Sequence, residues 1–195
     1  AAVAFAQYAE RLGLYDLASQ SYLYCAQLFQ YLYPSEPLPP HVYLPWALAC
    51  YNSRQNQQVC IQIAQTIRNG GQFDLFLEAI AGKAAAKAGD PAKAKEIFTQ
   101  AEQRAAQVLK TAPAQLKPNQ QSAGFPSVQL NAKQIAWFYC FARKDVAQAL
   151  GWAHQAYASE PNSPSAAGLL AYALTMSNDT KSAKAYLAAF EHTQV

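Results

Sequence analysis

Few residues of this 195-residue chain have the types and spacing that could support catalysis. Cys140 and His154 form the only pair that could serve as nucleophile and general base. We expect them on opposite helices of one helical pair, where a buried thiol and a surface or capping histidine is the simpler interpretation. The chain has no Gly-rich phosphate loop, HExxH, GxSxG or close CxxC pair, and its three histidines are scattered. We therefore predict no enzymatic activity, no metal site and no cofactor.

Two lysines and two aromatic residues have spacings that favour binding. Lys83 and Lys87 are four residues apart, so they share one face of a helix. If that face lined a groove, the two ammonium groups could hold an acidic peptide or a C-terminal carboxylate. They could equally be solvated surface lysines, and both interpretations stay open. Trp137 and Phe141 are also four apart. On an accessible surface they would be hot spots for an apolar partner side chain, and otherwise they pack against neighbouring elements.

The segment Gly82 to Ala101 indicates which elements position these residues. It reads as two short helices bent back on each other, because Gly89 can end the first and Asp90 with Pro91 can open the second as N-cap and first-turn proline. Ala94, Phe98 and Ala101 then recur on one face of the second helix.

The same unit recurs at a period of 34 residues. Ala94 marks the small residue one turn into its second helix; Cys60 lies 34 residues upstream, and Ala149 and Ala183 are 34 apart. Ala18 precedes Cys60 by one period plus 8, and Ala149 follows Ala94 by one period plus 21. The additional 8 and 21 residues coincide with two proline-containing segments, 34–41 and 111–130, which we interpret as insertions between repeats.

Helix-capping residues and a stripe of apolar residues recur at fixed distances from the marker residue. Four residues before the marker stand Asn56, Asp90, Asp145 and Asp179, while Leu14 holds that place in the first unit, where we expect Asp16 to cap instead. Four residues after the marker stand Tyr22, Ala64, Phe98, Ala153 and Leu187, which we expect to be buried.

A 34-residue helix-turn-helix period with a small residue in each helix, and with Pro161 closing the fourth unit, resembles the tetratricopeptide repeat. The resemblance implies an all-α, right-handed solenoid of antiparallel helix pairs with about five units. It also implies that the first helices of successive units line a concave groove that holds a peptide. The groove positions that it implies are Arg11, Asn52, Lys83, Lys87, Trp137, Phe141 and Tyr172.

The repeat also predicts how the chain is organised. Residues 1–110 form units one to three with the insertion 34–41, and residues 131–195 form units four and five. Residues 111–130 are either a mobile linker or a segment lying across the groove, anchored by Phe125. The fourth unit fits the pattern if its turn at Arg143 to Asp145 is one residue short.

An aromatic-rich corner surrounds the first insertion. Its members are Tyr22, Tyr24, Tyr31, Tyr33, Tyr43 and Trp46. Such a cluster can be a recognition surface, but large aromatic residues more often fill core gaps where loops cross. We expect packing, and we interpret Pro34 to Pro40 as a stiff connection between helices.

Composition narrows the partner class. With 14% charged residues and a net charge of +3, the chain has no dense basic field for nucleic acid. No apolar run approaches the roughly 20 residues that span a bilayer. The four cysteines lack short paired spacings, which favours reduced, buried thiols and a cytoplasmic location. Because the sequence starts without methionine, we expect a removed leader or a piece of a longer protein.

These observations predict a non-catalytic scaffold that binds a peptide or protein segment in a concave groove. The alternative is an architectural or oligomerisation domain of a larger protein without a groove ligand. We expect Leu187 and Phe190 to lack a covering helix within this sequence, so that either more protein follows in the native chain or this end pairs with another subunit.

Overall fold

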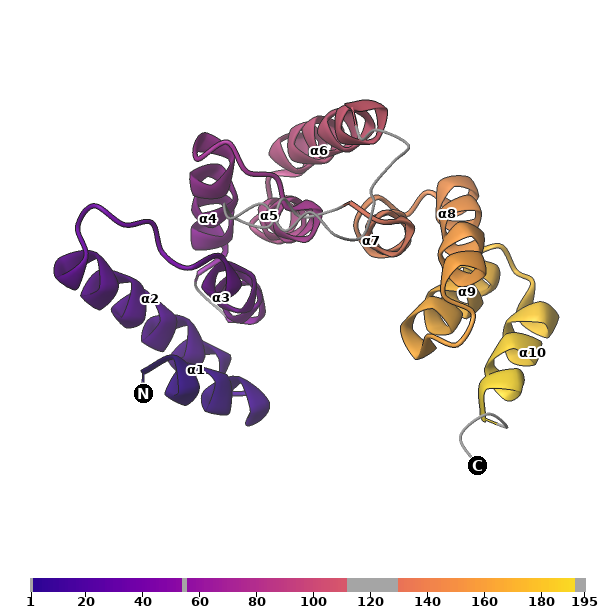
Figure 1. Cartoon of the computed structure of the whole chain (residues 1–195), viewed down its shortest axis with the longest axis horizontal. Helices are drawn as coiled ribbons and strands as arrows, with labels where there is room; N and C mark the ends of the chain where they lie inside the picture. Colours follow the sequence, from indigo (N-terminus) through magenta and orange to yellow (C-terminus); the bar gives the residue numbers. More distant parts are fainter. Residues whose placement is uncertain (1, 54–55, 112–129, 192–195) are drawn as a thin grey trace, which may run out of the picture. The chain divides into compact units, whose positions relative to one another are not determined.

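The structure is a computed structural model that describes residues 2–53, 56–111 and 130–191. Within those ranges the chain is all-helical and has no strand (Figure 1). Its elements are α1 Ala2–Arg11, α2 Tyr15–Leu32, α3 Pro40–Asn52, α4 Gln57–Asn69, α5 Leu75–Lys87, α6 Pro91–Thr111, α7 Ala132–Trp137, the π-helix η1 Phe138–Arg143, α8 Val146–Ser159, α9 Pro164–Met176 and α10 Thr180–Glu191. The all-α prediction is confirmed. The segment 112–129, with Phe125, lies outside the described residues.

The chain divides into two compact units, Ala1–Ala101 (unit one) and Glu102–Val195 (unit two), with the boundary inside α6. In unit one, three successive core clusters bridge neighbouring helices. The first is shared by α1, α2 and α3, the second by α3, α4 and α5, and the third by α4, α5 and α6. No single helix pair encloses a core of its own, which is the packing expected of a repeat.

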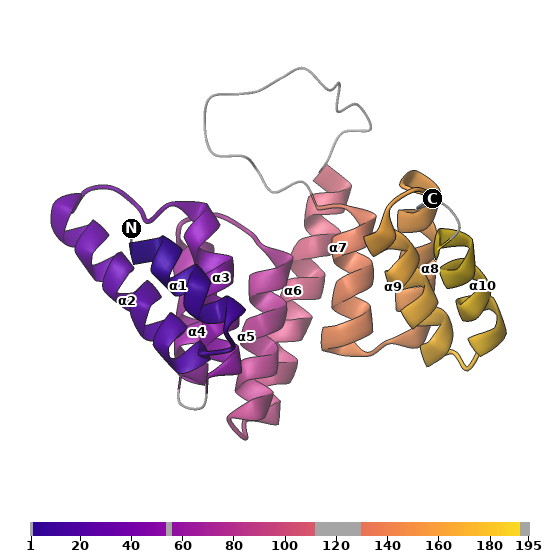
Figure 2. The same ribbon diagram turned by 90° about the horizontal axis from the view of Figure 1, so that it is seen from below.

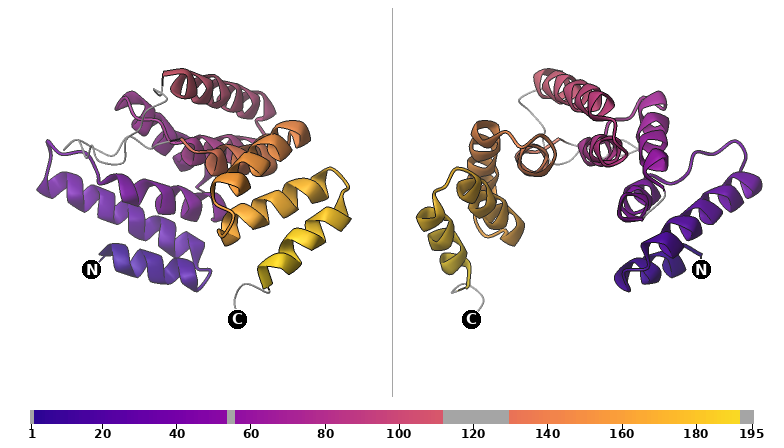
Figure 3. Two further views of the ribbon diagram at one scale, coloured as in Figure 1. Left: turned by 45° about the vertical axis from the view of Figure 1, so that its right-hand side comes forward. Right: turned by 180° about the vertical axis from the view of Figure 1, so that it is seen from behind.

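Unit two has one core cluster, to which α7, η1, α8, α9 and α10 all contribute. Consecutive helices pack here too: α7 lies beside α8 (Figure 1), and α9 lies beside α10 (Figure 2). The pairing of α9 with α10 is visible from two further directions in Figure 3. Arg143 also donates from Nε to Glu102 Oε1 at 3.0 Å, which ties η1 to the last part of α6.

The predicted period is confirmed at its marker residue. Each marker is the fourth residue of the second helix of a pair, and its side chain is at most 4% exposed. The five are Ala18 in α2, Cys60 in α4, Ala94 in α6, Ala149 in α8 and Ala183 in α10. The stripe four residues later is buried or partly buried, except for Leu187, which is exposed.

The turns before these second helices repeat one backbone geometry. A residue with a left-handed φ of 55° to 87° stands directly before the N-cap at Gly13, Gly89, Lys144 and Asn178. The turn after η1 holds two residues where the other three hold three, so the predicted short turn is confirmed. η1 itself is a π-helix, which has a wider turn than an α-helix. It belongs to the first helix of the fourth predicted repeat.

Three of the predicted caps are confirmed. The Asp90, Asp145 and Asp179 side chains each accept a hydrogen bond from the third backbone N–H of the following helix, at 2.8 to 3.1 Å. Asn56 occupies the N-cap, but its amide instead donates to Ser19 Oγ at 2.8 Å. The predicted Asp16 cap is wrong, because α2 begins at Tyr15 and leaves Asp16 inside the first turn.

A buried ion pair joins three helices of unit one. Arg68 on α4 donates through Nε and one Nη atom to both carboxylate oxygens of Glu78 on α5, and through its other Nη atom to Gln100 on α6. Glu78 is buried, so this two-pronged contact supplies the partners that its charge requires.

Gly82 offers a direct test of how closely α5 and α6 approach. A Cβ added there would lie 2.3 Å from Cε1 of Phe98, so we expect G82A to lower the free energy of unfolding by about 1–3 kcal/mol. G151A is the matched control, because Gly151 on α8 has nothing within 4 Å of the added atom, and it should raise stability by about 0.5–1 kcal/mol. Urea denaturation followed by circular dichroism measures both changes, and equal stability of G82A and wild type would contradict the close packing.

Candidate functional site

The seven groove positions implied by the resemblance fall into two sets. Arg11, Asn52, Lys83 and Lys87 belong to unit one, and Trp137, Phe141 and Tyr172 belong to unit two. Members of each set come from the first helices of successive pairs: α1, α3 and α5 in unit one, and α7, η1 and α9 in unit two.

Lys83 and Lys87 on α5 gather around Tyr51 near the end of α3. The Lys83 Nζ lies 6.0 Å and the Lys87 Nζ 5.1 Å from the centre of the Tyr51 ring. Lys87 Nζ also donates to the carbonyl oxygen of Tyr51 at 2.7 Å and lies 3.4 Å from that of Ser53. We call Tyr51, Lys83 and Lys87 the basic–aromatic patch.

The geometry gives Lys87 a structural role. Lys87 caps the last carbonyl groups of α3, where a positive charge is favoured by the helix dipole, so it is a structural contact between α3 and α5. The hydrogen bonds and ring contacts that define the patch do not include Arg11 or Asn52, which are exposed last residues of α1 and α3.

The three aromatic groove positions of unit two are brought together as a chain of rings. Trp137 and Phe141 have ring centres 5.5 Å apart, and Phe141 stacks on Tyr172 of α9 at 4.5 Å. Trp137, Phe141 and Met176 also pack against the core cluster of unit two, while Tyr172 is exposed. The rings therefore have both of the roles considered from the sequence, core packing at one end and an accessible ring at the other.

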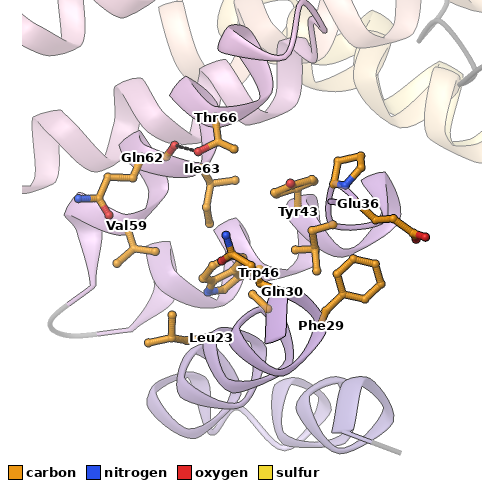
Figure 4. A pocket seen from close by; sticks show the side chains of 13 residues that line it. Leu23, Phe29, Gln30, Glu36, Tyr43, Trp46, Val59, Gln62, Ile63 and Thr66 are labelled. Atoms are coloured by element: carbon orange, nitrogen blue, oxygen red, sulfur yellow. Dashed lines mark hydrogen bonds between the residues drawn. The ribbon is translucent and has the colours of Figure 1, made fainter. Parts of the chain in front are cut away.

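Unit one also contains a pocket of about 570 Å³ between α2, the connection after it, α3 and α4 (Figure 4). Trp46 and Tyr43 of α3, Leu23 and Phe29 of α2, and Val59 and Ile63 of α4 give it apolar walls. Gln30, Gln62, Thr66 and Glu36 contribute polar groups to its lining, and the Glu36 carboxylate lies at its outer edge in Figure 4. The volume is in the range of sites that enclose small ligands or one or two large side chains.

Sequence reasoning found the aromatic corner but not this pocket. Packing was the expected role, and it is confirmed for Tyr22 and Tyr43, which are buried. It is wrong for Tyr24, Tyr31 and Tyr33, which are exposed. The proline-rich connection was the available signal, because Pro37 and Leu38 form one wall of the pocket and thus do more than join two helices.

The thiols of Cys25 and Cys140 are poorly suited to nucleophilic chemistry. All four cysteines are free and buried. Burial raises the pKa of Cys140 to about 11, so at neutral pH it is a thiol and not a thiolate. His154, its only candidate base, is an exposed residue of α8. Burial also raises the pKa of Cys25.

Residues 2–53, 56–111 and 130–191 contain no group of three or more His, Cys, Asp or Glu side chains that could hold a metal ion. No helix in the same ranges combines the length and apolar character needed to cross a bilayer.

Comparison with known proteins leaves the family open: no family model, no curated protein and no solved structure matches the chain. The resemblance to the tetratricopeptide repeat therefore rests on the period, the equivalent fourth residues and the repeated turn geometry.

The role of Lys87 is testable by stability. Because its ammonium group caps α3, we expect K87A to reduce the free energy of unfolding by about 1 kcal/mol. K95A, which removes an exposed lysine of α6, is the matched control and should change stability by less than about 0.5 kcal/mol. Chemical denaturation measures both changes. A K87A variant as stable as K95A would show that Lys87 is a solvated surface lysine that does not cap α3.

Burial of the cysteines predicts slow modification. In the folded chain at pH 8, we expect Ellman's reagent to react with none of the four thiols during the first minutes, and with all four once guanidinium is added. A rapidly reacting Cys140, identified by mass spectrometry, would contradict the buried, protonated thiol described above.

Proposed function

We propose that this chain is a non-catalytic interaction module that binds a peptide or protein segment of a partner. The pocket of unit one is the observation that carries the proposal. It is apolar and concave, and it is lined by Trp and Tyr, the side chains that dominate binding hot spots. Grooves of this kind between helices accept the apolar face of a partner segment, with one large side chain inserted as an anchor.

The tetratricopeptide-like groove is a second part of the same proposal. In it, successive pairs continue as a right-handed solenoid whose first helices line the groove, as the resemblance implies. Its candidate contacts are the Lys83 ammonium in unit one and the accessible ring of Tyr172 in unit two, whereas Lys87 serves chiefly to cap α3. A partner segment that binds at Lys83 would carry a carboxylate, and one that binds at Tyr172 would carry an aromatic or aliphatic residue.

A bulky side chain placed in the pocket distinguishes peptides that bind there from peptides that bind elsewhere on the surface. Gln30 lines the pocket and Gln27 does not, although both are exposed glutamines of α2. Peptides would be selected from a displayed library against the wild-type chain, and their affinities measured by fluorescence polarisation. We expect Q30W to weaken pocket-bound peptides at least about tenfold, the loss of one inserted anchor side chain, and Q27W to leave them unchanged.

Two more variants examine the groove. Peptides held by the groove should bind Q30W normally and lose affinity on Y172A or K83E. Selected peptides that bind all of these variants as tightly as the wild type, or a failure to select any peptide, would contradict the proposal and favour an architectural role. Thermal melts of each variant ensure that a lost affinity is not a lost fold.

A further inference from the structure

The first helix pair exposes an unusual amount of apolar surface. Twelve of the sixteen exposed large hydrophobic side chains of the described residues lie between Phe5 and Tyr33. Only three charged residues occur in that stretch, Glu10, Arg11 and Asp16. An exposed surface rich in Tyr and Leu and poor in charge has the composition of the centre of a protein interface.

Part of this surface forms a regular seam along α2 and its N-cap residue Leu14. Its six positions alternate in spacing by three and four residues, the heptad pattern of helices that pack side by side. They are Leu14, Leu17, Ser21, Tyr24, Leu28 and Tyr31. The five large side chains are 38% to 83% exposed, so no other described helix covers them.

The seam lies on the side of α2 that is not used within unit one. Leu23, Ala26 and Gln30 line the pocket toward α3 and α4, and Tyr22 and Cys25 are buried. By helical geometry, the seam positions occupy the remaining arc of the helix. The seam and the pocket are therefore separate surfaces.

Helix α1, the partner of α2 in this pair, carries further exposed apolar side chains. Phe5, Tyr8 and Leu12 lie across α1 from Val3, which packs against the first core cluster with α2 and α3. Together with the five large seam residues they offer roughly 800 Å² per chain, taking about 200 Å² for each of the eight side chains and about half of it exposed. A stable dimer buries about 800 Å² per partner.

The seam is complementary to itself in one orientation. Its positions are symmetric about the middle of α2, so an antiparallel copy brings Leu14 opposite Tyr31, Leu17 opposite Leu28 and Ser21 opposite Tyr24. The smallest side chain thus faces a large one at the centre. Ser21 donates its hydroxyl to the carbonyl of Leu17 at 2.8 Å, so its burial leaves no polar group without a partner.

We propose that the chain forms a two-fold symmetric homodimer through this seam, with α2 packed antiparallel against α2 of a second copy. No charged residue occupies a seam position, so the two copies do not repel each other there. A parallel arrangement would place Tyr24 against Tyr24 and Ser21 against Ser21, and it lacks this complementarity of size.

Paired charges test both the dimer and its orientation. In the antiparallel dimer, position 17 of one copy faces position 28 of the other. L17E/L28E places like charges together, and we expect it to weaken dimerisation at least about 100-fold. L17E/L28K places opposite charges together twice, and it should dimerise at least about tenfold more tightly than L17E/L28E. Q58E/Q65E adds two charges at exposed glutamines of α4, outside both the seam and the pocket lining, and should behave as wild type.

Sedimentation equilibrium of the full chain reads out the masses. We expect twice the 21.3 kDa of one chain for wild type, L17E/L28K and Q58E/Q65E, and a single-chain mass for L17E/L28E. If circular dichroism shows L17E/L28E to be unfolded, Y31R at the most exposed seam position replaces it, again with a single-chain mass expected. A wild type that stays monomeric at micromolar concentrations overturns the proposal and leaves the seam to a helix of another protein. An L17E/L28K variant as weak as L17E/L28E overturns the antiparallel register.

Discussion

The close approach of helices at one small side chain per pair is the constraint on which the rest of the structure depends. The fourth residue of each second helix is Ala or Cys, and it is buried in every pair. A larger side chain there would separate the two helices and expose the apolar residues one and two turns further on. Gly82 meets the same requirement on the first helix of its pair, because the Phe98 ring lies where a larger residue would place its Cβ.

Because each cluster of unit one is shared between neighbouring helices, the pairs are held together by their contacts with one another and not by a central core. The sides of the helices that take no part in this packing remain available to form binding surfaces. On α2, one side lines the pocket with the proline-rich connection, and the other presents the seam. A single 18-residue helix thus serves the fold and two proposed binding surfaces.

Residues of one type take different roles according to their neighbours. Lys87 on α5 donates to the carbonyl oxygens at the end of α3, whereas Lys93 on α6 pairs with Glu96 of its own helix. Among the tyrosines of the first two pairs, Tyr22 is buried and donates to Glu10 at 2.8 Å, whereas Tyr31 is the most exposed of them. Their spacing along the chain does not distinguish these outcomes, because both depend on which helix is packed alongside.

Local chemistry determined the helices, their turns and their period. Ala, Gly, Asp and Pro act through backbone preference and short-range hydrogen bonds, so the caps at Asp90, Asp145 and Asp179 and the short turn before Asp145 could be predicted from the sequence by itself. The Lys87 cap, the pocket over Trp46 and the stacking of Phe141 on Tyr172 were decided only by the tertiary structure. Each joins residues from different helices, and their distance in space is a property of how those helices pack.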